Sequence, residues 1–436
     1  MRSAAVSFAS VPFLLSSLFV AQAAQAEIVH ARLVPAPASQ ANAASRRVDV
    51  SANGKVVAFD SLASNWHPGF PSPNDKIVVV DLAEGIIDVV SSTTAGVAIT
   101  GVNPSLSRDG RYVTFANLGG NLDVGVPTSG WQIVRKDRVS GQLRLVSANA
   151  GGAAADRESR DASISGDGNV VVFRSWATNL GVDAGGYYQV FAKSLSSGAI
   201  VPVSVRPDGS LPNVDSVLTP HAISDNGRYV VFTNNAAMVT GVNAGTTQVF
   251  LRDLQAGTNE LVSRNTVGEA GNSLSDMAAI SPSGRFVSFR SFASNMGGNA
   301  STNSGVFVRD RTAGTTQAVP KPSLGGTLAN GCRESAVSDI GTVLMACTFP
   351  APTKDQVFLH LPGAAGTPFL VSGTALNVPG NDLSGSTLAV DASGLSMVYE
   401  SLASNLDPAD SNAASDIFVL VDTDLLDGIF ADGFED

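Results

Sequence analysis

The sequence predicts an all-β protein built from seven similar four-stranded units, and three observations support this prediction. The 436-residue chain is only 15% charged and holds 43 glycines, so it is poor in helix formers and rich in turn residues. A short turn motif recurs seven times at nearly constant spacing. The segments around each turn have the length and apolar character of β-strands.

The recurring turn is S-x-x-G, or D-x-x-G in the last unit, and an apolar run such as RYVTF or RYVVF follows it. The copies stand at 51–54, 107–110, 165–168, 224–227, 281–284, 338–341 and 391–394. Their glycines recur at intervals of 53 to 59 residues. A register held this well indicates an internal repeat, and it explains why SLASN occurs at both 61–65 and 401–405.

Each unit contains four predicted strands. One short strand ends at the S-x-x-G turn, a second follows at once, a third comes after a loop, and a short fourth ends the unit. A D-x-x-x-G segment joins the third and fourth strands at 81–85, 137–141, 253–257 and 310–314. Asp accepts hydrogen bonds from nearby backbone amides and Gly adopts left-handed conformations, so these segments are predicted hairpin turns.

Seven such units predict a seven-bladed β-propeller. The seventh unit has a third strand, DIFVLVD at 416–422, but no clear fourth strand after it. Near the N-terminus, 28–34 resembles a fourth strand, with the same 20-residue distance to the next turn as in the following unit. We therefore predict that 28–34 completes the seventh blade and closes the ring, because an open ring would expose strand edges.

The repeats resemble a known family. The segments ISPSGRFVSF…VFVRDRTAG and ISDNGRYVVF…QVFLRDLQAG are similar to the WD-type repeats of TolB-like propellers over nearly the whole mature chain. The resemblance implies the fold, which hosts many functions. The chain lacks the separate N-terminal domain of the best-known member and any attached hydrolase domain, so the resemblance implies neither a Tol-system role nor peptidase activity.

Export is expected from the first 26 residues, which carry Arg2, an apolar run and the ending AQAAQA, as in a secretory signal. Cleavage near Ala26 would leave a propeller at 27–423 and an acidic tail at 424–436, in the periplasm or outside the cell. No later apolar run reaches 18 residues, so no transmembrane helix is expected. The net charge of -11 argues against nucleic-acid binding. We expect a monomer.

Binding is expected on one face. If both kinds of tight turn lie at one end of the strands, all long connections lie at the other. Candidate binding residues in these connections are Trp131, Tyr187, Tyr188 and His67, which together would offer a stacking surface for a glycan or peptide. The alternative is that they are ordinary half-buried loop residues. Trp66 and Trp176 align with apolar positions of other units and are predicted core residues.

The two cysteines, Cys332 and Cys347, lie at matching distances from the turn at 338–341, so we predict a disulfide between the first two strands of blade 6. Two buried free thiols are the alternative.

The loop LDPADSNAASD brings together Asp407, Asp410 and Asp416, which with Asn412 would offer oxygens to calcium. A solvated acidic loop is the alternative, and no other cofactor is expected.

No catalytic residue is predicted, since the sequence holds no G-x-S-x-G, H-E-x-x-H, C-x-x-C or phosphate-binding glycine motif. The leading hypothesis is therefore an exported module that binds a protein or polysaccharide. One alternative is a propeller hydrolase or lyase acting on an extracellular polymer, with carboxylates or His gathered at the central channel. Another is a structural surface protein displayed through its C-terminal GIFADGFED.

Overall fold

The computed structural model describes most of the chain between Ile28 and Asp422. The described residues are 11–12, 28–35, 40–70, 74–120, 122, 130–297, 303–350, 354–363 and 366–422. The predicted signal segment, apart from 11–12, and the predicted tail at 424–436 lie outside them, as does Asn121.

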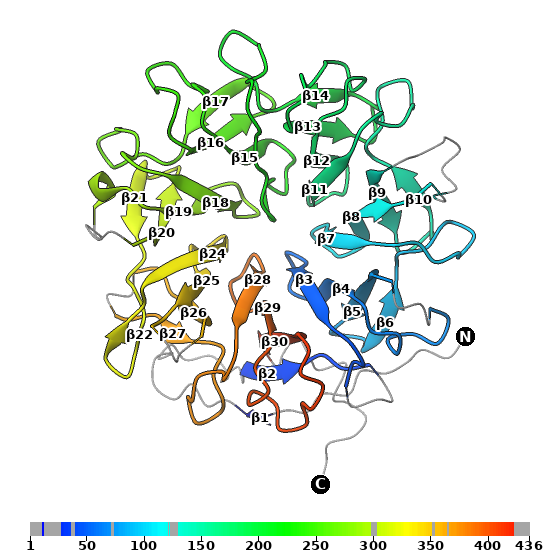
Figure 1. Cartoon of the computed structure of the whole chain (residues 1–436), viewed down its shortest axis with the longest axis vertical. Helices are drawn as coiled ribbons and strands as arrows, with labels where there is room; N and C mark the ends of the chain where they lie inside the picture. Colours follow the sequence, from blue (N-terminus) through cyan, green and yellow to red (C-terminus); the bar gives the residue numbers. More distant parts are fainter. Residues whose placement is uncertain are drawn as a thin grey trace.

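The described chain forms seven antiparallel sheets arranged around a central channel, as predicted (Figure 1). In chain order the strands of blades 1 to 3 are β3 (Ser45–Val50), β4 (Val56–Ser61), β5 (Lys76–Asp81) and β6 (Ile86–Val89); β7 (Val102–Leu106), β8 (Tyr112–Leu118), β9 (Trp131–Asp137) and β10 (Leu143–Leu145); and β11 (Ser159–Ile164), β12 (Val170–Ser175), β13 (Gln189–Ser194) and β14 (Ile200–Pro202).

The remaining blades follow the same order. They contain β15 (Tyr229–Asn234), β16 (Gln248–Asp253) and β17 (Thr258–Leu261) in blade 4; β18 (Ser275–Ile280), β19 (Phe286–Ser291), β20 (Gly305–Asp310) and β21 (Thr315–Ala318) in blade 5; β24 (Gly331–Val337), β25 (Val343–Thr348), β26 (Gln356–His360) and β27 (Phe369–Leu370) in blade 6; and β28 (Ser384–Val390), β29 (Met397–Ser401) and β30 (Asp416–Asp422) in blade 7.

Two small elements depart from the repeat. A one-turn 3-10 helix, Ser294–Met296, follows the second strand of blade 5, and β22 (Ser323–Leu324) pairs with β23 (Thr327–Leu328) between blades 5 and 6. Within the described residues no helix has the length and apolar character needed to cross a bilayer.

The S-x-x-G turns close through their first side chain. Ser107 Oγ accepts a hydrogen bond from Tyr112 N at 2.9 Å, and Asp391 Oδ1 plays the same part for Ser396 N at 3.0 Å. The last residue of each turn is a glycine with positive φ, as at Gly110 (72°). These turns lie at one end of the strands, which we call the turn face.

Backbone hydrogen bonds between neighbouring turns run around the turn face. Five blade junctions are made by the second turn residue, in the order Arg108 N to Gly166 O, Gly166 N to Asp225 O, Asp225 N to Pro282 O, Asp339 N to Ala392 O and Ala392 N to Ala52 O, at 2.8 to 3.1 Å. Between blades 1 and 2, Asn53 N donates to Arg108 O at 3.1 Å.

Pro282 has no N–H to donate, so the junction between blades 5 and 6 is different. There Ser283 N donates to the carboxylate Oδ1 of Asp339 at 2.6 Å. A turn-face hydrogen-bond circle therefore links all seven blades.

The long connections lie at the opposite end, which we call the loop face. The Asn of the SLASN position fastens them: Asn65 Oδ1 accepts from Asn42 N at 3.1 Å, and its Nδ2 donates to Gln40 O at 2.8 Å. Asn405 makes the equivalent pair with Asn381 N and Pro379 O. The recurring Asn is therefore a structural residue.

The core lies between the blades, where the second and third strands bury both faces. Phe59, Phe115, Phe173, Phe232 and Phe289 occupy the same position of five second strands, and each is at most 1% exposed. Large apolar side chains repeated in this way fill the space between neighbouring sheets.

The seventh blade closes as predicted. Strand β2 (Ile28–Arg32) pairs antiparallel with β30, and Arg32 lies opposite Phe418. The residues Val11–Pro12 (β1), within the predicted signal segment, pair with the outer edge of β2. Two ends of the chain thus share one sheet.

Buried polar side chains lie at the seam, by which we mean the junction of β2 with β29 and β30 in blade 7. His30 stacks on Tyr399 and its Nε2 lies 2.7 Å from the Tyr399 hydroxyl. Burial lowers the pKa of His30 to about 4.

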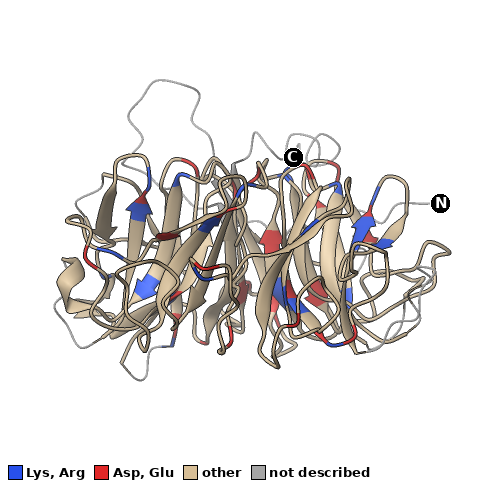
Figure 2. Cartoon of the chain, turned by 90° about the horizontal axis from the view of Figure 1, so that it is seen from above, with Lys and Arg blue, Asp and Glu red and all other residues tan. Residues whose placement is uncertain are grey.

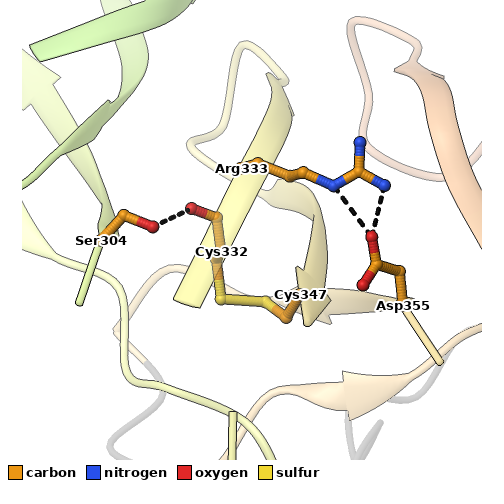
Figure 3. Close-up of a disulfide and its surroundings, with 5 residues drawn as sticks. All are labelled: Ser304, Cys332, Arg333, Cys347 and Asp355. Carbon is orange, nitrogen blue, oxygen red and sulfur yellow. Dashed lines mark hydrogen bonds and ion pairs between the residues drawn. A yellow bond between two sulfur atoms is a disulfide. The ribbon is translucent and has the colours of Figure 1, made fainter. Parts of the chain in front are cut away.

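The predicted disulfide between Cys332 and Cys347 is present, and these residues lie directly opposite each other in β24 and β25 (Figure 3). In blades 1, 3, 5 and 7 the same position holds a pair of serines with Oγ atoms 2.8 to 3.1 Å apart. The disulfide therefore replaces a side-chain hydrogen bond that recurs in four other blades.

Candidate functional site

A repeated irregularity shapes the central channel. The first strand of most blades contains a β-bulge, and Arg47, Asn103, Asp161 and Met277 adopt left-handed backbone conformations there, with φ of 50 to 55°. Non-glycine residues adopt this conformation only at a free-energy cost. Bulges redirect side chains, and the first three of these residues line one cavity of the channel.

Blade 4 departs from this pattern because Pro220 occupies the bulge position. Proline cannot adopt a positive φ, and the left-handed residue is instead His221, with φ of 57°. The first strand of this blade is reduced to two isolated bridges, Val217 to Thr233 and Ile223 to Val230. This local break positions His221 in the channel wall.

A carboxylate from blade 1 faces this histidine. The Oδ1 atom of Asp49 lies 3.6 Å from Nδ1 of His221, and Asp49 is 4% exposed. Its oxygens accept hydrogen bonds from Val50 N at 2.7 Å and Leu106 N at 2.8 Å. Burial raises the pKa of Asp49, with His221 and these hydrogen bonds opposing the shift.

The Asp49 position also has a structural role. Ser105 and Ser163, its equivalents in the next two blades, accept a hydrogen bond from the neighbouring blade in the same way, from Ile164 N and Ala222 N at 3.3 Å. A carboxylate has a second oxygen, and in Asp49 this oxygen meets His221. The pair thus bridges blades 1 and 4.

The channel cavity, of about 200 Å³, lies beside this pair. Its walls include apolar groups of Val48, Pro104, Ala162, Leu218 and Pro220. Polar lining comes from residues such as Asn103, Thr219 and Thr387. A smaller cavity of about 50 Å³ shares Asp49, Ser105 and His221 and continues toward the turn face.

Ion pairs surround the loop-side end of the channel. Arg47 Nη1 lies 2.6 Å from Asp60 Oδ2, and Arg174 pairs with Asp161. Burial raises the pKa of Asp60 to about 7, with Arg47 opposing the shift. Burial also raises the pKa of Glu400. Acidic and basic residues are interspersed along the strands (Figure 2).

Two of the predicted binding residues are connected. The Tyr188 hydroxyl donates to Glu158 Oε2 at 3.1 Å, Glu158 pairs with Arg160, and the Arg160 guanidinium lies 4.9 Å from the centre of the Trp131 ring. Trp176 lies 6.5 Å from the Tyr188 ring. We call these five residues the aromatic cluster of blades 2 and 3.

The other two candidates are not part of this cluster. Tyr187 is 39% exposed, next to Tyr188 in the chain. His67 packs edge-on against Phe70 at 5.4 Å, and its Nδ1 accepts a hydrogen bond from Gly69 N, all within the blade 1 loop. His67 therefore has partners within its own loop.

The prediction for Trp66 is confirmed and that for Trp176 is wrong. Trp66 is 1% exposed and packs against Phe59. Trp176 is only half-buried, and Arg157 lies over its ring at 4.8 Å. Its position stands at the loop-side end of the second strand, beyond the interblade core. Alignment of the repeats identified equivalent residues but gave no information on burial.

The equivalent residues form an apolar collar, defined as Leu62, Leu118, Trp176, Phe292 and Leu402. Leu118 is 48% exposed, Phe292 38% and Leu402 36%, and the other two are half-buried. Leu274 and Leu383, both 37% exposed, lie beside two of them, because they accept backbone hydrogen bonds from Phe292 N and Leu402 N. The collar residues stand at the loop-side end of the second strand in five of the seven blades, whereas blade 4 holds Asn235 at this position.

The three acids of the predicted calcium loop surround Arg32 of β2. Asp407 Oδ2 lies 2.7 Å from Arg32 Nε, and Asp416 Oδ2 and Asp410 Oδ1 lie 3.0 and 3.6 Å from Nη1. The Arg32 side chain is 1% exposed. Burial, opposed by Arg32, raises the pKa of Asp416 to about 6.

These acids thus bind a buried guanidinium and are not a solvated loop. Among the residues that the structure describes, no group of three or more His, Cys, Asp or Glu side chains is arranged to hold a metal ion. Calcium binding stays a prediction.

Comparison with known proteins supports the fold. No family model matches the sequence, and no curated protein matches it. An oligogalacturonate lyase from Vibrio parahaemolyticus is 11% identical with a TM-score of 0.57, over 96% of this chain and 98% of that chain. An acylaminoacyl peptidase is 11% identical with a TM-score of 0.50, over 87% of this chain and 51% of that chain.

TolB from Acinetobacter baumannii is 13% identical with a TM-score of 0.39, over 73% of this chain. The match spans 63% of the TolB chain, less than two thirds of its length. At these identities the likeness to the lyase and the peptidase shows a shared propeller fold and nothing about activity.

Proposed function

We propose that this protein is an exported binding module that engages a protein or polysaccharide through its loop face. The observation that carries the proposal is the apolar collar. The same position is apolar in five units and solvent-accessible in each. Apolar side chains exposed at an equivalent position of several units are candidates for an interaction site, because exposed apolar patches mark such sites.

The aromatic cluster of blades 2 and 3 extends this surface. Trp131 and Tyr188 offer large contact areas, and Glu158 and Arg160 fix their positions. Aromatic and Arg side chains are enriched among residues that dominate binding energy. The partner surface would therefore contact the collar and this cluster together.

Export, a monomeric state and a TolB-like family assignment belong to the same proposal. The disulfide supports export, because such bonds persist in oxidising compartments. The WD-type repeat pattern supports the family assignment.

The experiment compares recovery of partners from an envelope extract and binding to purified polysaccharides. The variant Phe292→Ser/Leu402→Ser removes two collar residues and is expected to lose the ligands that wild type binds. Trp131→Ala/Tyr188→Ala tests the cluster. The matched control is Ile340→Ser, since Ile340 is 56% exposed in a turn-face loop. Equal binding by the collar variant and wild type would reject the proposal.

The alternative is a hydrolase or lyase acting on an extracellular polymer. Asp49 and His221 favour it, because a carboxylate beside a histidine in a channel can serve as an acid–base pair. The oligogalacturonate lyase among similar folds makes polyuronates one substrate to test. Cleavage of a polymer by wild type, lost in His221→Gln, would support this alternative.

A further inference from the structure

We propose that the channel cavity is a binding site for a small neutral molecule with several hydroxyl groups, about the size of one sugar ring. The site is distinct from the loop-face collar and does not depend on the function proposed for it. It rests on the His221 imidazole, the shape and lining of the cavity, and the backbone conformation of its walls.

The geometry at His221 determines what the ligand offers. Nδ1 lies 3.6 Å from the Asp49 carboxylate, which favours the tautomer that carries its proton on Nδ1. The Nε2 atom is then an acceptor, and it is buried with no hydrogen-bond partner in the protein. A buried acceptor without a partner is unfavourable. A hydroxyl group of a bound ligand would donate to it.

The charges in the cavity favour a neutral ligand. Arg47 is paired with Asp60, and Asp161 with Arg174. Both Asp49 oxygens already accept backbone hydrogen bonds. No cation among these lining groups is left to bind a phosphate or a carboxylate.

The size of the cavity and the chemistry of its walls further restrict which ligands can bind. A volume of about 200 Å³ corresponds to roughly seven water molecules at ~30 Å³ each, which is room for a single small ring. Apolar walls beside a few polar groups are typical of small-molecule sites. A sugar ring combines an apolar face with hydroxyl groups at its edge and fits both kinds of wall.

Backbone strain is concentrated in the same walls. Four residues that line the cavity, Arg47, Asn103, Asp161 and His221, are left-handed without being glycine. Proteins retain such conformations where the surrounding structure holds them in place, and these positions cluster at ligand sites. Repetition of the bulge around one cavity therefore points to a site for which the backbone is arranged.

Saturation-transfer NMR tests the proposal with glucose, galactose and mannose as probes, each added separately to the full chain. Glucuronate and glucosamine are the charged comparisons. At least one neutral sugar is expected to bind more tightly than either charged sugar. Failure of all three neutral probes to bind, or tighter binding of a charged one, would overturn the proposal.

Two variants locate the site by different means. His221→Asn removes the Nε2 acceptor but tolerates the left-handed backbone, and Ala162→Leu fills the cavity from an apolar wall. Each is expected to weaken sugar binding about tenfold or more, since a hydrogen bond or the space itself is lost. His360→Asn, in β26 and outside the cavity lining, is the matched control and should bind as wild type does. Unchanged binding in a folded variant of either kind would place the sugar elsewhere and reject the site.

Discussion

The two faces of the propeller are built on different rules. On the turn face the units repeat one type of turn, and hydrogen bonds between these turns link each blade to the next, through second turn residues at five of the seven junctions. On the loop face the units share only the fastening Asn and an apolar collar position, while the cavity, the aromatic cluster and the Arg32 pairs each arise from residues of particular blades. The repeated turns thus hold the ring together, whereas residues that differ between the blades form the candidate sites.

The largest expected effect comes from deleting β2, the strand that completes blade 7 and closes the ring. Deletion of 27–35 removes β2 and leaves Asp407, Asp410 and Asp416 buried without Arg32. Breaking a buried ion pair by removing one partner costs about 3–5 kcal/mol, and the lost strand adds to this. We expect aggregation or loss of cooperative unfolding, measured by calorimetry. Deletion of 424–436 is the control, and an unaltered Tm in the first deletion would contradict ring closure.

The seam should also show a pH dependence. The pKa of His30 is about 4 in the folded protein against 6.5 ordinarily, so the unfolded chain binds more protons between these values. The free energy of unfolding should therefore fall as pH decreases from 6.5 to 4, by up to about 3 kcal/mol from this group. Above pH 6.5 its contribution is complete and constant.

Denaturant titrations of wild type and His30→Gln across this range measure that contribution as a difference. The raised pKa of Asp60 makes the free energy of unfolding change with pH in the opposite direction. Asp60 is present in both proteins, so its contribution cancels in the difference. A difference that stays constant from pH 4 to 6.5 would count against a buried neutral His30.

Variants at the disulfide test how much this bond stabilises blade 6 relative to the serine pair found in other blades. Reversion to the serine pair of other blades, Cys332→Ser/Cys347→Ser, should lower the free energy of unfolding by up to about 3 kcal/mol, because a 15-residue loop is no longer closed in the unfolded chain. Cys332→Ala/Cys347→Ala should be less stable than the serine variant by about 1 kcal/mol, since it also lacks the hydrogen bond. If non-reduced peptide mapping found free thiols in the wild-type protein, both of these stability predictions would be contradicted.

A glycine pair compares the turn-face circle with a peripheral hairpin. At Gly166 in the turn-face circle, an added Cβ would lie 2.7 Å from Asp225 Cγ, whereas at Gly151 in the hairpin after β10 the nearest contact is the Asn149 side chain at 3.4 Å. Gly166→Ala should cost about 1–3 kcal/mol through crowding. Gly151→Ala should change stability by about 0.5 kcal/mol or less. Equal effects in thermal melts would mean that the turn-face circle is no less tolerant of an added Cβ than the hairpin.

The smallest effect is expected from calcium. The carboxylates of the predicted calcium loop already bind the Arg32 guanidinium. A ligand stabilises a protein only if it binds the folded state, so calcium at millimolar concentration should leave the Tm within about 1 °C. A clear upward shift, absent from Asp410→Asn, would instead support the calcium hypothesis.

The sequence alone predicted those features of the fold that follow from the internal repeat. The spacing of the S-x-x-G turns predicted the blades, the missing fourth strand predicted the role of 28–34, and the distances of Cys332 and Cys347 from their turn predicted the disulfide. Each of these follows from short-range geometry or from equivalence between units.

The candidate site was missed because it depends on contacts between distant blades. The spacing of His221 from the other histidines identified no site in the sequence, since only the structure shows that Pro220 displaces the left-handed residue and that Asp49 lies opposite. The one available signal was proline at a position where other units have bulged residues. Arg32 likewise meets Asp407 and Asp416 only after the ends of the chain are joined.

The turn-face circle also bears on how such a chain can change in length during evolution. Insertions and deletions in a long connection leave every junction intact, so the loop face can vary freely in size. Removal of a whole unit is different, because the two newly adjacent turns would have to close a circle of smaller radius with the same bond lengths. Lengths of homologous chains should therefore vary by loop residues and not by one repeat at a time.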